Sequence, residues 1–435
     1  MKYNIVIHNG TILTMNYDLD IVKNGDLCIK NHKLDKIEPH KNHAPLPEGK
    51  KIIDARGGII MPGLVNTHTH LPMALFRGLA DDLPLSKWLN EYIFPAEANH
   101  IHPKSVRIGA LLSSAEMLLS GTTTCCDGYF HEDHVAAAMN EIGMRGILGQ
   151  GVIDFPAPGV PKPEDNVNNA IKFLKKWKNI SSLITPSVFC HSPYTCSKTT
   201  LKKAKDAADA AGVLFQIHAA ETKDEYIQIQ TKHHATPIKY LDKIGIIDQN
   251  TLLVHAVWLD DDDIEIIAKR GASVSHNPGS NMKLASGIAP VPELLKAGVT
   301  VGLGTDGCAS NNNLDLISEM DTAAKLHKVN ALDPTLLDAV TVLKMATIQG
   351  AKALGLDTII GSLEIGKKAD VIVIDIHKPH LVPIYNPISH MVYAAQGSDV
   401  QDVIVNGRLL VKDRELLTIN IKDIIEKVIK FSENL

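Results

Sequence analysis

Two histidines separated by one residue, His68 and His70, are the first feature of this 435-residue chain that could do chemistry. They lie near the end of the segment MPGLVNTHTHL, after a proline-glycine turn and an apolar run. On an extended strand, residues i and i+2 point to the same face, so both imidazoles would project together where the strand ends. Such a pair supplies two ligands of a metal site, although in a chain with 20 histidines it could also be two surface side chains.

The middle of the chain, from about residue 61 to 360, alternates short apolar segments with amphipathic helical segments. Eight of the apolar segments run into polar residues at their C-terminal ends, a pattern that predicts an α/β fold of the (β/α)8 TIM-barrel type. Barrels of this type keep their catalytic residues at those strand ends. The expected strands are 63–70, 121–130, 145–154, 184–193, 214–221, 251–259, 272–278 and 299–307.

Both ends of the chain predict short antiparallel strands. Alternating polar and apolar runs divided by Asn-Gly and Gly-Gly turn signals fill the first 60 residues, and the pattern returns in KKADVIVIDI and VQDVIVNGRLLVKD. We therefore expect a small β-sandwich domain formed from both termini, residues 1–60 and 361–416. The barrel would occupy residues 61–360, and a C-terminal helix residues 417–435.

The composition excludes several classes of function. The net charge is −5 and no dense run of lysine and arginine occurs in the body of the chain, which argues against nucleic-acid binding. No apolar stretch approaches the ~18 to 20 residues that span a bilayer, and the N-terminus lacks a signal-peptide core. The six cysteines form no C-x-x-C pair, which fits a cytoplasmic protein. The oligomeric state stays open, a homo-oligomer included.

The polar strand ends supply further candidates. Three histidines with an aspartate form a nitrogen-rich donor set that suits Zn²⁺, with Fe²⁺ as the alternative. A bound divalent cation lowers the pKa of water towards neutrality, so water is the expected nucleophile and Glu221 could carry its proton. The candidates, in strand order after His68 and His70, are His191, His218 with Glu221, His255, His276 and Asp306.

Each candidate also has a structural explanation. His218 and His255 could be packed core histidines, and Asp306 in GLGTDG could form a turn that caps the next helix. His276 in SVSHNP could simply shape a loop, so we do not rank it as a ligand.

Taken together, the chain resembles the amidohydrolase superfamily over essentially its whole length. The resemblance implies one metal ion held by His68, His70, His218 and Asp306. Binuclear members carry a carboxylated lysine on the fourth strand, where this chain offers His191, so one metal per chain is expected. The matching pieces, in order, are PGLVNTHTHLP, FQIHAAET, LLVHAVWL, SVSHNPGSNMKLASGIAPV, GLGTDGCASNNNLD and GSLEIGKKADVIVID.

The segment LFRGLADDLPLSKWLNEYIFPAE is similar to the 5-methylthioadenosine and S-adenosylhomocysteine deaminases, as are HSPYTC and DGCASNNNLD. By that resemblance the small-molecule partner of the chain would be a purine nucleoside. Glu97 would hold its ribose hydroxyls. Trp88 would line the nucleoside pocket, although it could also be a helix-packing aromatic. His191 would reach the sugar or the purine, and Ser310 would also contact the substrate.

The reaction implied by the resemblance is hydrolysis of a C–N bond in a cyclic amidine, at C6 of the adenine, with release of ammonia. Glu221 would bind the substrate and protonate N1. His255 would stabilise the attacking oxygen. Asp306 would relay a proton to the departing amine.

One departure concerns the 5′ substituent. Family members that accept S-adenosylhomocysteine carry an arginine in the loop after the third strand, but here that loop reads DFPAPGVPKPEDNVNN, with Lys162 as the nearest cation. A lysine lacks the bidentate fork of arginine. We therefore expect 5-methylthioadenosine as the substrate before S-adenosylhomocysteine, with adenosine as a further substrate.

Two other functions stay open. The first is hydrolysis of another exocyclic substituent, as in guanine or cytosine deaminases and s-triazine chlorohydrolases, whose ligands are much the same. The second is a non-catalytic scaffold with the amidohydrolase fold. A scaffold predicts missing ligands, whereas all four are present in this chain.

Overall fold

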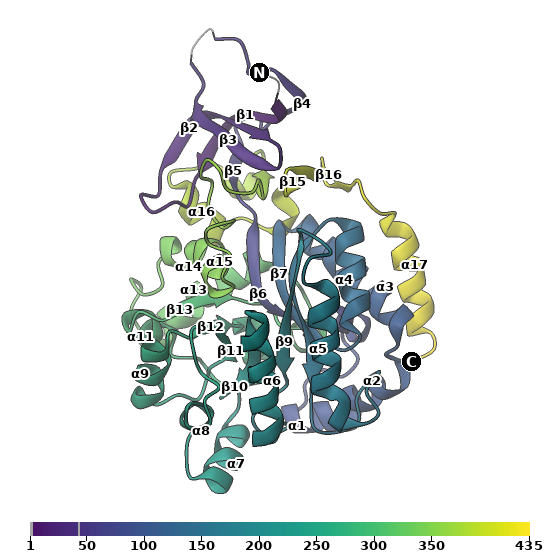
Figure 1. Ribbon diagram of the computed structural model, residues 1–435. Helices are drawn as coiled ribbons and strands as arrows, with labels where there is room; N and C mark the ends of the chain where they lie inside the picture. Colours follow the sequence, from purple (N-terminus) through teal and green to yellow (C-terminus); the bar gives the residue numbers. More distant parts are fainter. Residues whose placement is uncertain (1–2, 42–43) are drawn as a thin grey trace.

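The structure is a computed structural model that describes residues 3–41 and 44–435. Its centre is an eight-stranded sheet in which every strand pairs in parallel with the next one along the chain (Figure 1). The expected (β/α)8 barrel is therefore confirmed. Its strands are β6 (Leu64–Thr69), β7 (Thr122–Tyr129), β8 (Arg145–Val152), β9 (Ile184–Cys190), β10 (Phe215–Ala219), β11 (Thr251–His255), β12 (Ser273–His276) and β13 (Thr300–Leu303).

Helices follow the barrel strands and bury their outer faces, so the strands are almost entirely buried, as expected of a parallel sheet. Side-chain caps start several of them: Ser197 accepts a hydrogen bond from the backbone of Thr200, and Asp260 accepts one from Asp263. The longer helices are α3 (Pro103–Leu119), α4 (Glu132–Ile142), α5 (Asn166–Trp177), α6 (Lys198–Ala211), α7 (Lys223–His233), α9 (Asp261–Arg270) and α13 (Leu316–Ala331).

Shorter helical segments complete the barrel and shape its mouth. Those near the mouth are η1 (Leu71–Phe76), α1 (Leu85–Lys87), η2 (Trp88–Ile93), α2 (Phe94–His100), η3 (Pro163–Asp165), α10 (Pro278–Lys283) and α12 (Cys308–Asn311). The others are α8 (Pro237–Lys243), α11 (Val291–Lys296), α14 (Ala339–Met345) and α15 (Ile348–Ala353).

The two ends of the chain meet in a second, nine-stranded sheet, where β5 pairs antiparallel with β14. This sheet lies above the barrel in Figure 1 and has its own buried apolar cluster, as expected of a composite terminal domain. The exact boundaries between the regions stay a prediction. The strands are β1 (Tyr3–Leu13), β2 (Ile21–Lys30), β3 (Lys33–Pro39), β4 (Gly49–Asp54), β5 (Ile59–Pro62), β14 (Val371–Ile374), β15 (Val400–Val405), β16 (Arg408–Lys412) and β17 (Glu415–Leu416), with η4 (Pro379–Leu381), α16 (Pro387–Tyr393) and η5 (Gly397–Asp399) between them.

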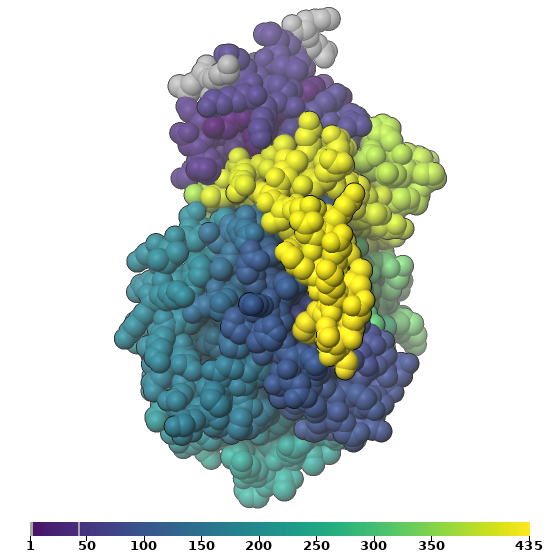
Figure 2. Space-filling view, turned by 90° about the vertical axis from the view of Figure 1, so that its right-hand side faces the viewer, coloured from purple at the N-terminus to yellow at the C-terminus, as the bar shows by residue number. Residues whose placement is uncertain are grey.

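The last helix, α17 (Ile421–Ser432), lies along the surface of the barrel beside α3 (Figure 2). Phe431 packs its ring 6.4 Å from that of Phe76 in η1, so the C-terminal helix contacts the segment that follows His70. Within the described residues, no helix combines the length and apolar character that crossing a membrane requires.

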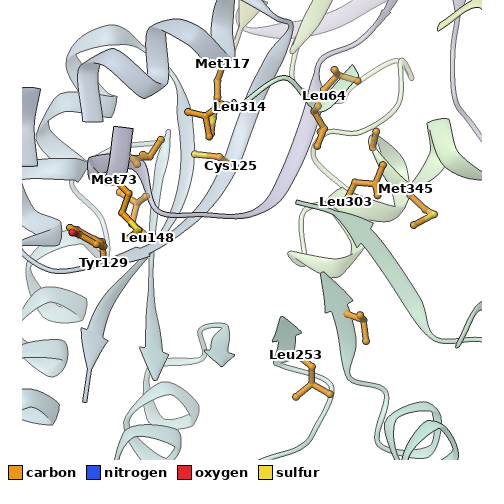
Figure 3. Close-up of a cluster of buried hydrophobic side chains, with 14 of the residues drawn as sticks. Leu64, Met73, Met117, Cys125, Tyr129, Leu148, Leu253, Leu303, Leu314 and Met345 are labelled. Atoms are coloured by element: carbon orange, nitrogen blue, oxygen red, sulfur yellow. The ribbon is translucent and has the colours of Figure 1, made fainter. Parts of the chain in front are cut away.

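A large apolar cluster fills the space between the barrel strands and the helices (Figure 3). Leu64, Leu253 and Leu303 come from three different barrel strands, and all are fully buried. Close packing of this kind resists displacement of one strand against the next. The cluster therefore holds the polar strand ends in fixed relative positions.

A buried ion pair joins the barrel to the terminal sheet. Arg145, at the start of β8, donates from Nε and Nη2 to the two carboxylate oxygens of Asp370, at 2.8 and 3.0 Å. Asp370 also accepts the backbone N–H of Asn406, beyond β15. The side chains of Arg145 and Asp370 are only 6% and 2% exposed, so neither charge has access to water if its partner is lost.

Replacement of Arg145 by alanine should destabilise the protein by about 3–5 kcal/mol, because the Asp370 carboxylate would stay buried without its partner. Urea denaturation followed by circular dichroism measures the change. The matched control is Arg56→Ala, which breaks a pair with Asp413 whose side chains are 58% and 54% exposed and should have little effect. Equal losses of unfolding free energy in Arg145→Ala and Arg56→Ala would contradict the stabilising role of the buried Arg145–Asp370 pair.

Candidate active site

Four side chains predicted as metal ligands converge at the C-terminal mouth of the barrel. His68 lies in β6, His70 directly follows it, His218 lies in β10, and Asp306 follows β13. The Nε2 atoms of His68 and His70 each lie 3.4 Å from Oδ1 of Asp306. The Nε2 atom of His218 lies 3.2 Å from that of His68. The fold thus brings together residues up to 238 positions apart, from His68 to Asp306.

These donors suit a divalent cation. Burial lowers the pKa of His68 to about 4 and that of His218 well below its ordinary value, so both imidazoles are neutral at pH 7. His70 Nδ1 lies 2.6 Å from the carbonyl oxygen of Gly128, which requires the proton on Nδ1 and leaves a lone pair on Nε2. Two neutral imidazole nitrogens 3.2 Å apart are close enough to bind the same cation. A three-histidine, one-carboxylate set with this arrangement is typical of zinc.

Asp306 is held from several sides. Ser280 and Ser310 donate to its Oδ2 at 2.6 and 2.8 Å, and the backbone N–H of Gly307 donates to Oδ1 at 2.8 Å. Burial alone would raise the pKa of Asp306, but its hydrogen bond with His68 and its electrostatic interaction with His70 hold it well below the usual range. The carboxylate is therefore ionised and fixed in orientation.

Two further groups face the same point. The Nε2 atom of His255 lies 3.9 Å from Oε2 of Glu221. A ring nitrogen of His255 also lies within 4.8 Å of ring nitrogens of His68 and His218. His255 Nδ1 lies 2.9 Å from Oδ1 of Asn281, which orients the ring. Burial raises the pKa of Glu221, which favours proton uptake by its carboxylate. A carboxyl group with a raised pKa thus lies beside the predicted ligands.

A cavity of about 400 Å³ opens over these groups. Its floor contains His70, His218, Glu221, His255 and Asp306, and its walls are mainly apolar. The apolar wall residues include Leu85, Trp88, Phe94, Phe155, Pro158 and Phe189. Such a cavity has the size and lining of a small-molecule site.

Glu97 lies in the wall of the cavity, paired with a tyrosine. The hydroxyl of Tyr129, at the end of β7, donates to Oε1 of Glu97 at 2.5 Å. Burial raises the pKa of Glu97 to about 7, and the Tyr129 hydrogen bond opposes that rise. Because one oxygen is engaged by Tyr129, the other is available to a ligand in the cavity.

The remaining predicted substrate-binding residues also line the cavity: Trp88, His191 and Ser310. Trp88 is buried in η2, His191 bonds through Nδ1 to Thr195 Oγ1 at 2.9 Å, and Ser310 is engaged with Asp306. Their contact with a substrate stays a prediction. His276 lies outside this cavity, buried against His327 with their Nε2 atoms 3.1 Å apart.

Sequence reasoning missed Tyr129 and Ser280. Tyr129 ends a barrel strand, so the strand-end rule that selected the histidines could have selected it too. Ser280 gives no comparable signal, because its contact with Asp306 depends on how α10 packs over the barrel mouth.

Several known proteins resemble this chain over nearly its whole length. The model of the amidohydrolase family matches residues 59–410. A 5-methylthioadenosine/S-adenosylhomocysteine deaminase of Syntrophobacter fumaroxidans is 47% identical over 98% of this chain and 97% of its own length. A 5'-deoxyadenosine deaminase of Methanosarcina mazei is 43% identical over 99% and 98%. The crystal structure of an adenosine deaminase from Xanthomonas campestris with bound zinc has a TM-score of 0.97 and 34% identity, covering 100% and 98% of the two chains.

Replacement of His70 by alanine should reduce bound metal to below about a tenth of an equivalent per chain, because one nitrogen of a four-ligand set is lost. Elemental analysis of protein expressed with added zinc measures this directly. His134→Ala, on α4 and outside the cavity, is the matched control and should retain the wild-type metal content. A full equivalent in His70→Ala would rule out this ligand set.

Proposed function

The chain belongs to the amidohydrolase family, within it to the 5-methylthioadenosine/S-adenosylhomocysteine deaminases, and we propose that it hydrolyses the C6 amino group of an adenine nucleoside. Water replaces the amine, so the products are ammonia and the corresponding inosine derivative. The observation that carries the proposal is the position of Glu221 and His255 beside the four converging ligand atoms, on the floor of an apolar cavity. When bound, the divalent ion would act as a Lewis acid that makes water a nucleophile at neutral pH.

The chain's own residues move the protons. Glu221, whose pKa is raised by burial, can take a proton from the attacking water and deliver it to N1 of the purine. His255, oriented by Asn281, lies beside Glu221 and can hydrogen-bond to the attacking oxygen. The ionised Asp306 can accept the remaining proton and pass it to the departing amine.

Glu97 supports a nucleoside rather than a free base. A buried carboxylate with one oxygen on Tyr129 needs further hydrogen-bond donors, and the vicinal hydroxyls of a ribose supply them. Trp88 and His191 lie in the same cavity, where they would contact the nucleoside. A free-base or triazine hydrolase would have no use for Glu97 in this position.

The 5′ side of the proposed site is apolar. The loop after β8 contributes Ile153, Phe155, Pro156, Ala157, Pro158 and Pro161 to the cavity wall, while Lys162 is exposed and is not part of it. Among the described residues, no lysine or arginine lines the cavity. A 5′-methylthio or 5′-deoxy group fits such a wall, whereas the carboxylate of S-adenosylhomocysteine would lose hydration without gaining a partner.

The proposal also covers the metal cofactor and the cellular compartment. We expect one zinc ion per chain, with iron as the alternative, because imidazole suits both metals. The six cysteines are free and buried, which fits a reducing cytoplasm. The oligomeric state is left open.

The substrate preference is tested with a matched series. For 5-methylthioadenosine and 5′-deoxyadenosine, kcat/KM should exceed that for S-adenosylhomocysteine by about tenfold or more, because the apolar wall offers no partner to a carboxylate. An ultraviolet assay of deamination measures all three, and adenosine isolates the effect of a 5′-hydroxyl. If S-adenosylhomocysteine has the highest kcat/KM, the apolar loop after β8 does not set the preference for the 5′ group. Inactivity towards every adenine nucleoside would overturn the proposed function.

The role of Glu97 is tested through pH. Because its pKa is about 7, protonation below that value removes acceptor capacity for the ribose, so KM should rise as the pH falls from 8 to 6. Glu97→Gln should raise KM at pH 8 by about 10- to 100-fold, the loss of a charged hydrogen bond, and should make KM independent of pH. A 2′-deoxy substrate is the matched probe, since it offers Glu97 one hydroxyl fewer. A KM that does not change in Glu97→Gln would exclude ribose binding by this residue.

A further inference from the structure

The turn after β10 has an unfavourable backbone conformation. Ala220, between His218 and Glu221, has a φ of 55°, in the left-handed region that residues with a side chain rarely adopt. A conformation of this kind persists only when the surroundings hold it. The turn sets the direction in which the Glu221 side chain leaves the strand, so whatever holds Ala220 also fixes Glu221.

Glu225 makes the contacts that hold this turn. Its Oε1 accepts the backbone N–H of Ala220 and its Oε2 accepts that of Glu221, both at 2.8 Å. Glu225 itself is fixed in the first turn of α7, because Thr222 Oγ1 accepts its backbone N–H. One carboxylate therefore clamps two consecutive peptide groups of the turn.

No other contact among the described residues accounts for the burial of the Glu225 side chain. Glu225 is 2% exposed and does not line the cavity. Among the hydrogen bonds and ion pairs of the described residues, none joins it to a lysine or arginine. Burial raises the pKa of Glu225 to about 8, and the backbone N–H groups of Glu221 and Ala220 oppose that rise. A carboxyl group so placed is costly to bury unless its oxygens are satisfied, and here both go to the Glu221 turn.

The same turn supports the neighbouring strand end. The carbonyl oxygen of Ala220 accepts the backbone N–H groups of Val257 and Trp258, at 2.9 and 2.8 Å. Those residues follow His255, so displacement of Ala220 would also disturb the segment that carries His255. The clamp therefore connects both groups that flank the predicted metal ligands.

We propose that Glu225 is a positioning residue for deamination, which sets the Glu221 carboxyl against the reacting purine by holding the Ala220–Glu221 peptide groups. The inference rests on the proposed function for its kinetic consequences, but the clamp itself is a property of the fold. Glu225 neither lines the cavity nor hydrogen-bonds to the predicted metal ligands, so its effect must pass through the turn that carries Glu221 and supports the segment after His255.

The variant Glu225→Gln tests the clamp with minimal change in shape. The glutamine amide keeps one acceptor and turns a donor towards the other backbone N–H, so one hydrogen bond is lost. We expect kcat to fall by about 10- to 100-fold, the usual effect of losing such a support, while KM changes less than about twofold and metal content is unchanged. Affinity for a transition-state analogue with a tetrahedral hydroxyl at C6 should fall with kcat, and affinity for the product nucleoside should not.

The matched control is Asp263→Asn. Asp263 is also a buried carboxylate at a helix start, where it accepts the backbone N–H of Asp260 at 3.1 Å and the hydroxyl of Thr236 at 2.5 Å, but it lies outside the cavity. Its variant should lower the melting temperature and leave kcat unchanged. If Asp263→Asn lowers kcat as much as Glu225→Gln, or if Glu225→Gln keeps the wild-type kcat, the positioning role is wrong.

A readout independent of activity separates this inference from the proposed function. Hydrogen exchange in the peptide that contains Ala220 and Glu221 should accelerate by about tenfold or more in Glu225→Gln, because one of the two amides loses its acceptor. Unchanged exchange would overturn the clamp even in an active enzyme. A wild-type protein inactive on every nucleoside, with faster exchange in the variant, would overturn the proposed function and leave the clamp standing.

Discussion

The site depends on the seam of the barrel, where the last strand, β13, meets the first strand, β6. The paired order of the strands begins at β13 and ends at β6, so individual contacts rather than a ladder join these two. Asn66 accepts the backbone N–H of Thr305 at 3.1 Å and donates to its hydroxyl at 2.8 Å, and Asp306 donates its backbone N–H to the carbonyl of His68 at 3.0 Å. These bonds set the first and last strands in register. His68 and Asp306 meet only because the seam closes in this register.

Three left-handed residues lie where the chemistry is predicted, among others elsewhere in the chain. Ala220, His255 and Asp306 all have left-handed backbones, with φ of 55°, 76° and 61°. Each such residue costs on the order of 1–3 kcal/mol and must be compensated by its surroundings. The compensation is visible at two of them: Glu225 clamps the Ala220 turn, and two serines with Gly307 N–H hold the Asp306 carboxylate. The turns thereby direct side chains into the cavity at angles that a regular strand would not give.

Much of this arrangement could be predicted from the sequence, because it depends on periodicity along single strands. His68, His218 and His255 were identifiable as strand ends, and a parallel barrel gathers its strand ends at one mouth. The pairing of Tyr129 with Glu97 could not be predicted in the same way, because it joins a strand to a helix through packing that leaves no local pattern. Glu225 could not be predicted either, because a glutamate four residues after Glu221 is ordinary helix sequence. Only the folded turn brings the backbone N–H groups of Ala220 and Glu221 to its carboxyl group.

In the binding mode that we propose, the two walls of the cavity discriminate between substrates by different physics. At the proposed ribose contact, Glu97 is a buried carboxyl group, so a substrate without hydroxyl groups would leave it unsatisfied, which is a strong penalty. At the 5′ end the wall is apolar, and apolar walls separate a hydrogen from a methylthio group only weakly. The combination favours an enzyme that is strict about the sugar and tolerant of small apolar 5′ groups. A charged 5′ tail is the exception, because it must leave water without finding a partner in the wall.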